Sequence, residues 1–387
     1  MTTTQQKNIP VIWINARFLT RAITGVERVA IEIISALVEH HLDAQGQWHS
    51  PGGRIQFQLI APRTATALNN PWPSLPMKQT GTGNGHMWEQ TVLPIVTWYD
   101  GLINFCNTGP LFKRCQWMFF HDAQTFAIPE NFTKALRFWY QTLFRISGYF
   151  SIGILTNSWF SAKELSRYAA IAPERITVAP LGADHMDRRQ ADFSQRLQVL
   201  MDALKGKPFV LAVSSTSPNK NFASVIAALS LLGEDAPPCV IVGQRYDRVF
   251  ASSPLDTQRV HHLGYVSDGE LVALYQRAGL LIYPSFYEGF GLPPLEAMWH
   301  GCPVIAANTS ALPEVCADAA IYCDPHQPQT LSDAIARVMQ NEPLRQNMRL
   351  LGIQRARKYL WSNTVQHVLD SIIQNLALHS SQTSRDL

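Results

Sequence analysis

The sequence predicts an α/β protein made of two domains, each built around a parallel β-sheet. Its 387 residues exceed what one ordinary core needs and favour two domains of about 150–200 residues each. Strand-like apolar runs alternate with helical stretches in two successive series, which indicates parallel sheets covered on both faces. With 46% hydrophobic and 16% charged residues the composition is globular, and a net charge of +3 gives nucleic-acid binding no general support.

The first series predicts an N-terminal domain over residues 1–190. It opens with a strand, a glycine-containing turn and a helix, at VIWIN, TRAITG and VERVAIEIISALVEH. The segment NNPWPSLPMKQTGTGNGHMW is rich in Pro, Gly and Asn and is predicted to be a loop. Further strands are predicted at RIQFQLIAP, DGLINFC, WMFFHD, SIGILTNS and ITVAPLGAD, with helices at KALRFWYQTLFRI and SAKELSRYAA.

The second series predicts a C-terminal domain over residues 200–360, after a polar stretch at 187–204 that is the best linker candidate. The last segment, WSNTVQHVLDSIIQNLAL, follows the completed second sheet. We expect it to form an amphipathic helix over about residues 361–378 that crosses back to the first domain. Strands and helices of the second series alternate through KPFVLAV, ASVIAALSLL, PCVIVG, DGELVALYQRA, LLIYPS, LEAMWHG, PVIAA, AAIYCD and TLSDAIARVMQ.

The termini and the cysteines favour a cytoplasmic protein. MTTTQQKNIP lacks the basic and apolar regions of a signal peptide, and no apolar run approaches the length of a membrane span. The six cysteines contain no CxxC pair, so we expect reduced and mostly buried thiols.

The stretch PSFYEGFGLPPLEAMWHG, from Pro284 to Gly301, is the strongest candidate for a site. It follows the strand LLIYPS, and ligands of open parallel sheets bind beyond the carboxyl ends of the strands. Its glycines allow close approach of a ligand to the backbone, and its paired prolines suit a first helical turn. Unpaired N–H groups before LEAM would then bind an anion.

Two carboxylates bracket this anion site. Glu288 follows the strand, and Glu296 is expected in the first helical turn, where each could accept hydrogen bonds from hydroxyls. An anion-binding backbone with two such acids fits a sugar nucleotide. A tight turn with two solvated acids is the alternative that spacing alone leaves open.

The same stretch resembles the signature of retaining glycosyltransferases of family 4, in which the two acids form an E-x₇-E motif. The likeness extends to WINARFLTRAITGVERVAIEI, FFHD, RITVAPLGAD, FVLAVSSTSPNKN and LGYVSDGELVALYQRAGLLIYPS. It implies the GT-B fold, in which two Rossmann-like domains with parallel sheets face each other across a cleft. The first domain would mostly bind the acceptor, and the second would mostly bind the nucleotide sugar.

Residue roles follow from the resemblance. Glu296 would bind the ribose hydroxyls, Glu288 would lie by the donor sugar, and Lys220 would bind the diphosphate as a point charge. In the first domain, His121 could hydrogen-bond a sugar hydroxyl, or be satisfied by local backbone. The remaining predicted contacts are Gly25 in a loop over the diphosphate and the backbone amides of Phe290, Gly291 and Leu292.

Two positions depart from the family pattern. Asn219 stands where many relatives carry an arginine before the lysine, and Arg245 is the candidate that replaces its charge. Asn15 stands where relatives often carry an aspartate, which puts the contact to the acceptor in doubt.

The resemblance implies metal-independent transfer, because no D-x-D pair is present to hold a divalent ion. It also implies retention of configuration by a front-face route, since no carboxylate is a convincing nucleophile. The overall pattern is similar to bacterial mannosyltransferases of surface-polysaccharide assembly. We therefore expect GDP-mannose as donor, with UDP-glucose or another nucleotide hexose as alternatives, and no cofactor.

The acceptor is expected to be a saccharide, with a polyprenyl-linked one as an option. Residues 131–150 mix cations with aromatic residues and could lie on the inner face of the cell membrane, or form a helix with its aromatics in the core. A nucleotide-sugar 2-epimerase and a non-catalytic sugar-nucleotide-binding protein are the rival functions. An NAD-dependent dehydrogenase is disfavoured, because GFGLPP has proline where the third glycine of its fingerprint belongs.

Overall fold

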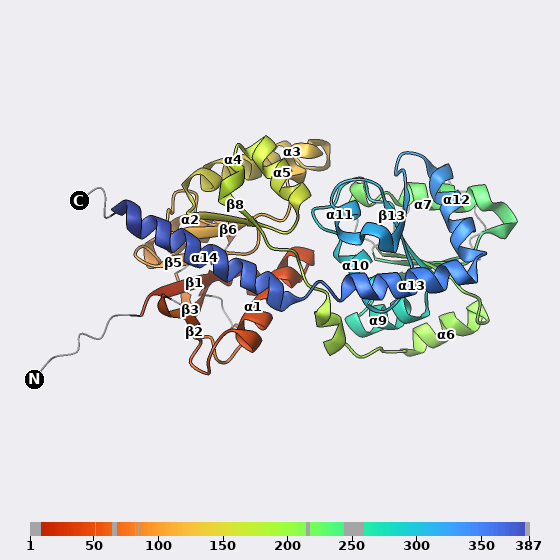
Figure 1. The fold of residues 1–387 in the computed structure, drawn as a ribbon, viewed down its shortest axis with the longest axis horizontal. Helices are drawn as coiled ribbons and strands as arrows, with labels where there is room; N and C mark the ends of the chain where they lie inside the picture. Colours follow the sequence, from red (N-terminus) through yellow and green to blue (C-terminus); the bar gives the residue numbers. More distant parts are fainter. Residues whose placement is uncertain are drawn as a thin grey trace, which may run out of the picture. The chain divides into compact units, whose positions relative to one another are not determined.

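The computed structural model describes residues 9–50, 52–63, 68–81, 83, 85–213, 217–243 and 259–383, with side chains as far as residue 378. The chain divides into two compact units. Unit 1 comprises Met1–Pro180 and Trp361–Leu387, and unit 2 comprises Leu181–Leu360. Each unit has its own β-sheet with helices packed against it (Figure 1).

The sheet of unit 1 contains eight strands among the described residues, in the order β2-β3-β1-β5-β6-β7-β8, with β4 paired to β3. β2 runs antiparallel to β3, and the other pairs are parallel. The strands are β1 (Val11–Asn15), β2 (Gln47–Ser50), β3 (Gly53–Pro62), β4 (Met77–Thr80), β5 (Gly101–Asn104), β6 (Gln116–Phe119), β7 (Gly153–Thr156) and β8 (Ile176–Val178).

Side chains cap the starts of α1, α4 and α5 in unit 1. Thr24 and Glu27 form a reciprocal capping box at α1, and Ser158 accepts a hydrogen bond from the amide of Ser161 at α5. The α-helices are α1 (Gly25–His40), α2 (Gly85–Val96), α3 (Gln124–Ala127), α4 (Lys134–Phe150), α5 (Trp159–Ala169) and α14 (Trp361–Thr383). Short 3₁₀ turns are η1 (Arg17–Thr20), η2 (Pro129–Asn131) and η3 (Pro173–Arg175).

The last helix, α14, belongs to unit 1, where it packs against α1, β7 and β8 (Figure 1). Its Asn375 side chain accepts a hydrogen bond of 3.0 Å from the indole N–H of Trp117 on β6. Gly153 on β7 leaves the space for this contact, because a Cβ there would lie 2.4 Å from Asn375 Oδ1. The helix therefore completes the packing of the first sheet.

Unit 2 has a sheet with six described strands, all parallel, in the order β11-β10-β9-β12-β13-β14. Its strands are β9 (Val210–Val213), β10 (Cys239–Val242), β11 (Val260–Gly264), β12 (Leu280–Tyr283), β13 (Val304–Ala307) and β14 (Ala320–Cys323). Its helices are α6 (Gln195–Leu204), α7 (Phe222–Leu232), α9 (Asp268–Arg277), α10 (Leu292–Trp299), α11 (Leu312–Cys316), α12 (Pro328–Met339) and α13 (Glu342–Ala356). Short 3₁₀ turns are η4 (Asp184–Arg188), η5 (Pro218–Lys220), η6 (Gly233–Asp235) and η7 (Ala317–Ala319).

Three local predictions were wrong. The expected linker at 187–204 holds η4 and α6, and the unit boundary falls at Pro180 rather than near residue 190. The segment predicted as a loop contains β4 and the start of α2, because apolar packing of Trp88 and Leu93 outweighs the Gly- and Pro-rich flanks. Glu296 lies beyond the first turn of α10, which begins at Leu292.

The strand order reverses once in each sheet. In unit 1, β2–β4 lie on one side of β1 and β5–β8 on the other, so the reversal falls between β1 and β5. In unit 2, β10 and β11 lie on one side of β9 and β12–β14 on the other, so it falls between β9 and β12. Such reversals open a crevice at the carboxyl ends of the strands, where α/β proteins bind ligands.

Candidate active site

An ion pair lies at the strand reversal of unit 2. Lys220 follows β9, and its ammonium lies 2.7 Å from Oε1 of Glu288, which follows β12. The same ammonium donates a 2.7 Å hydrogen bond to the hydroxyl of Tyr283, the last residue of β12. Because an ammonium has three protons and the described residues accept two of them, one remains for a ligand.

The ammonium of Lys220 is held in its charged form. Burial opposes the charge of Lys220, but the Glu288 carboxylate and the Tyr283 hydroxyl outweigh it and raise the pKa of the ammonium above its ordinary value. Burial and the charge of Glu288 also raise the pKa of the Tyr283 hydroxyl, which stays protonated at neutral pH. The site therefore presents a fixed positive charge beside a carboxylate.

Two asparagines fix the loop that carries Lys220. Asn221 adopts the left-handed conformation with φ of 57°, and its amide donates to the carbonyls of Pro284 and Pro325. Asn219 is buried, and its amide donates a 2.9 Å hydrogen bond to the carbonyl of Tyr287. Asn219 therefore positions the loop before Glu288, a role that a long exposed arginine would not fill.

The glycine loop after Glu288 has the backbone that its sequence predicts. Gly291 has φ of +104° and precedes α10, and a Cβ there would lie 2.6 Å from Leu312 Cδ2. Among the described residues, none accepts a hydrogen bond from the amides of Phe290, Gly291 and Leu292. These three amides could therefore bind an anion, helped by the dipole of α10.

Glu296 lies on α10 in a buried polar contact. Its Oε1 lies 3.1 Å from Nε2 of His185, and its Oε2 accepts a 3.3 Å hydrogen bond from the hydroxyl of Tyr275. Each carboxylate oxygen has a second lone pair, so Glu296 can still accept a hydrogen bond from a ligand hydroxyl. The sequence analysis missed His185 and Tyr275, because they are 111 and 21 residues away in the chain.

The predicted residues of unit 1 differ in their surroundings. His121 is buried, and its Nε2 lies 2.7 Å from the carbonyl of Phe105, while its backbone N–H donates to Asn107. Burial lowers the pKa of His121 to about 4, so the imidazole is neutral and its Nδ1 is the remaining acceptor. Gly25 is the first residue of α1, and no atom lies within 4 Å of the position a Cβ would take.

A second buried ion pair lies at the strand reversal of unit 1. The Arg17 Nε lies 2.9 Å from Glu89 Oε1, which also accepts 3.0 Å hydrogen bonds from the side chains of Asn15 and Thr108. His86 Nδ1 lies 3.2 Å from the other oxygen, Oε2. Burial opposes the charge of Glu89, but the bond with His86 and the charge of Arg17 outweigh it and lower the pKa of the carboxyl.

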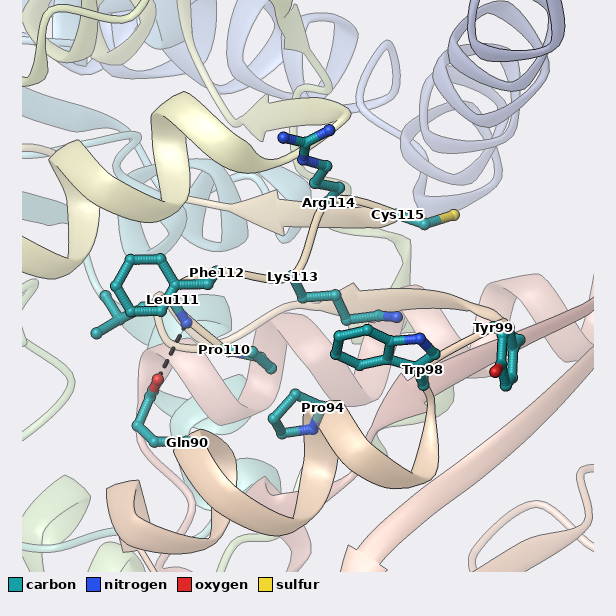
Figure 2. Close-up of a pocket in the computed structure, with 10 residues that line it drawn as sticks. All are labelled: Gln90, Pro94, Trp98, Tyr99, Pro110, Leu111, Phe112, Lys113, Arg114 and Cys115. Carbon is teal, nitrogen blue, oxygen red and sulfur yellow. Dashed lines mark hydrogen bonds between the residues drawn. The ribbon is translucent and has the colours of Figure 1, made fainter. Parts of the chain in front are cut away.

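An apolar pocket of about 840 Å³ lies in unit 1 between the end of α2 and the segment before β6 (Figure 2). Trp98 and Phe112 are exposed on it, and Lys113 extends past the indole of Trp98 with its ammonium bonded to the carbonyls of Thr97 and Asp100. The amide of Leu111 donates to Gln90 on α2, which ties the two walls together.

The segment 131–150 forms α4, and its aromatics divide between core and surface. Phe144 is buried, and Trp139 and Tyr140 pack against the same core cluster, whereas Phe138 is exposed. The guanidinium carbon of Arg145 lies 5.1 Å from the ring centroid of Phe126, so Arg145 makes a cation–π contact within unit 1.

The structure brings Lys220, Glu288, Gly291 and Glu296 into one unit, on neighbouring elements at one strand reversal. Arg245 lies outside the described residues. Within the described ranges, no three His, Cys, Asp or Glu side chains cluster so as to hold a metal ion. No described helix is both long enough and apolar enough to cross a membrane.

Comparison with known proteins identifies the class. Residues 202–355, which include Lys220, Glu288 and Glu296, match the family model of glycosyl transferases group 1. The O-antigen chain mannosyltransferase B of Escherichia coli is 32% identical over 263 residues, covering 65% of this chain and 68% of that protein. The chain belongs to the group 1 glycosyltransferases, and it is a glycosyltransferase.

Solved structures share the fold over nearly the whole chain. The sucrose-phosphate synthase of Thermosynechococcus elongatus superimposes with a TM-score of 0.71 at 17% identity, covering 96% of this chain and 100% of that one. HepE of Anabaena in complex with UDP-glucose gives a TM-score of 0.69 at 16% identity, covering 94% and 99%. The predicted GT-B fold is thereby confirmed.

Proposed function

We propose that this glycosyltransferase moves mannose from GDP-mannose to a saccharide acceptor in bacterial surface-polysaccharide biosynthesis. The likeness to a protein named O-antigen chain mannosyltransferase supports the sugar and the pathway class. The observation that carries the proposal is the Lys220–Glu288 ion pair beside the open amides of the glycine loop, because together they fit a nucleoside diphosphate sugar. The family match favours transfer over 2-epimerisation.

In this proposal each group has a role. The free proton of Lys220 and the amides of Phe290 to Leu292 would bind the diphosphate, on which negative charge grows as the sugar departs. Glu296 would accept hydrogen bonds from the ribose hydroxyls. Glu288 would lie by the donor sugar, held by Lys220.

We propose that the transfer retains configuration by a front-face route. The carboxylate of Glu288 is already ion-paired with the ammonium of Lys220 at 2.7 Å, and this pairing makes the carboxylate a weak nucleophile. The departing phosphate oxygen would instead help to deprotonate the acceptor hydroxyl on the same face of the sugar. A covalent glycosyl adduct on Glu288, detected by intact mass, would contradict this route.

The donor can be identified by thermal unfolding of the purified chain with a panel of nucleotide sugars in EDTA. A donor at about 100 times its Kd stabilises by about 2.7 kcal/mol. We expect a rise of several degrees with GDP-mannose and none with UDP-glucose, and EDTA tests metal independence in the same samples. A rise in unfolding temperature with UDP-glucose alone would identify UDP-glucose as the donor in place of GDP-mannose. No rise with any nucleotide sugar would contradict the proposed function.

We also propose that unit 1 contacts an anionic membrane, where a lipid-linked acceptor would be available. Trp98, Tyr99 and Phe112 line the pocket in Figure 2 with exposed fractions of 69%, 95% and 68%, and Arg114 is exposed beside them. Exposed aromatics next to cations are typical of surfaces that bind the membrane interface. In α4, Trp139, Tyr140 and Phe144 pack into the core cluster while Phe138 and Tyr149 are exposed, so we propose this surface beside α4.

The membrane proposal predicts that Trp98→Ala/Tyr99→Ala/Phe112→Ala no longer floats with phosphatidylglycerol vesicles, whereas the unchanged chain does. The expected cause is loss of apolar area at the interface. Tyr265→Ala in unit 2 removes an equally exposed aromatic and is the matched control. Equal flotation of the triple variant and the control would discard this surface.

A further inference from the structure

We propose that the acceptor saccharide binds in unit 1 through the imidazole of His86, which the buried carboxylate of Glu89 holds in place. This inference rests on the proposed function, because it names the acceptor-binding group of the same transfer. It assigns a role to a histidine that lies in a segment predicted as loop.

The location is the first argument. Asn15 is the last residue of β1 and Asn104 is the last residue of β5, and the amide of Asn15 donates to both Asn104 and Glu89. Glu89 is therefore fixed at the carboxyl ends of the two strands between which the strand order reverses. Both ion pairs lie at the strand reversal of their sheet, although Glu89 is on α2 and Glu288 follows β12.

The Glu89 carboxylate is buried and has four protein partners. Three donors reach Oε1, from Asn15, Arg17 and Thr108, and His86 reaches Oε2. Arg17 is also engaged, since its second nitrogen donates a 3.0 Å hydrogen bond to Thr108. With exposed fractions of 6% and 1%, the side chains of Arg17 and Glu89 present little surface to a ligand. The evident task of the ion pair is to orient the histidine that projects from it.

One ring nitrogen of His86 is hydrogen-bonded within the protein, and the other is available to a ligand. Its Nδ1 lies 3.2 Å from Oε2 of Glu89, and in the tautomer that donates this hydrogen bond Nε2 is an acceptor. The side chain is 37% exposed, and no described residue hydrogen-bonds Nε2. An oriented imidazole nitrogen open to solvent can accept a hydrogen bond from a sugar hydroxyl. His121, by contrast, is only 6% exposed.

Aromatic rings complete the site. The ring of Trp139 lies 5.4 Å from that of His86, and the ring of Tyr140 lies 6.2 Å away at an angle of 87°. Among the described residues, the buried indole N–H of Trp139 has no acceptor. Burial raises the pKa of Tyr140, and the charges of Arg21 and Arg17 act on it in the opposite direction. Flat aromatic surfaces with a few polar groups suit a sugar ring better than a free anion.

Two variants of His86 separate ligand binding from support of Glu89. In His86→Gln the terminal amide reaches the position of Nε2, whereas in His86→Asn it reaches only the position of Nδ1. We expect His86→Asn to lower kcat/KM for transfer to 4-nitrophenyl α-D-mannopyranoside by about 100-fold, and His86→Gln by about 10-fold or less. The Kd for the donor should stay the same in both, because the proposed contacts of Lys220, Glu288 and Glu296 with the donor lie in unit 2.

His49→Ala is the matched control, because His49 forms the same kind of pair with Asp43, at 2.8 Å, on the edge strand β2. If His86 only supports Glu89, His86→Asn keeps its activity and His86→Gln loses it, and the proposal is overturned. Equal kcat/KM for all three variants would overturn it as well. Absence of any donor-induced stabilisation of the unchanged chain would instead refute the proposed function.

Discussion

Lys220→Met is expected to lower kcat/KM for glycosyl transfer by about 10²–10³-fold, the loss that follows removal of one group that stabilises transition-state charge. The variant removes the ammonium that would neutralise the departing diphosphate and keeps a side chain of similar length. It also leaves the carboxylate of Glu288 without its partner at 2.7 Å. Steady-state rates with the donor found in the thermal panel, compared with circular dichroism of the same samples, measure the effect.

Two further variants separate the causes. The double variant Lys220→Met/Glu288→Gln also removes the unpaired carboxylate. Activity that it regains relative to Lys220→Met therefore measures the effect of the unpaired carboxylate and not that of lost diphosphate binding. Lys207→Ala deletes an exposed lysine of the same unit and should leave the rate unchanged. A rate for Lys220→Met within tenfold of the unchanged chain would show that the diphosphate is neutralised elsewhere.

Glu89→Ala is expected to destabilise unit 1 by about 3–5 kcal/mol, because it leaves the guanidinium of Arg17 buried without its charge partner. The donors of Asn15 and Thr108 lose their acceptor as well. Tryptophan fluorescence reports this loss, because Trp299 is the only one of the ten tryptophans within unit 2. The measurement is the urea midpoint of the fluorescence transition.

The double variant Arg17→Met/Glu89→Met tests the stated cause. Removing both charges should cost less than removing Glu89 alone, since no buried charge is then unpaired. Glu39→Ala, at an exposed position of α1, should change the free energy of unfolding by about 0.5 kcal/mol or less. If Glu89→Ala lowers the free energy of unfolding as little as Glu39→Ala does, the guanidinium of Arg17 is solvated and the stated cause is wrong.

The candidate site of unit 2 could be predicted from sequence because most of it is local. Glu288, the glycine loop and Glu296 lie within nine consecutive residues, and their order after a strand fixes their place at the edge of the sheet. The assignment of Lys220 to this site came from the resemblance alone, and its contact with Glu288, 68 residues away in the chain, was not predicted. The local sequence pattern around Glu296 does not indicate its contacts with His185 and Tyr275.

The polar cluster of unit 1 could not be found in the same way. Asn15 and Glu89 are separated by 74 residues, and Glu89 lies on a helix that its Gly- and Pro-rich surroundings conceal. A signal was present, since Trp88, Val92 and Val96 recur with the spacing of a buried helical face, but Pro94 argues against a helix there. The parallel α/β architecture was predictable from the strands that are continuous apolar runs, whereas the polar strands β2 and β4 were not predicted.

The return of α14 to the first sheet affects the order in which the chain can fold during synthesis. Residues 181–360 leave the ribosome before α14, so unit 2 has its whole sequence while unit 1 still lacks the helix that covers β7 and β8. Domains usually complete folding from the amino terminus. In this chain the domain that is synthesised first completes its folding last. Until α14 has been synthesised, the indole N–H of Trp117 lacks the acceptor that Asn375 provides.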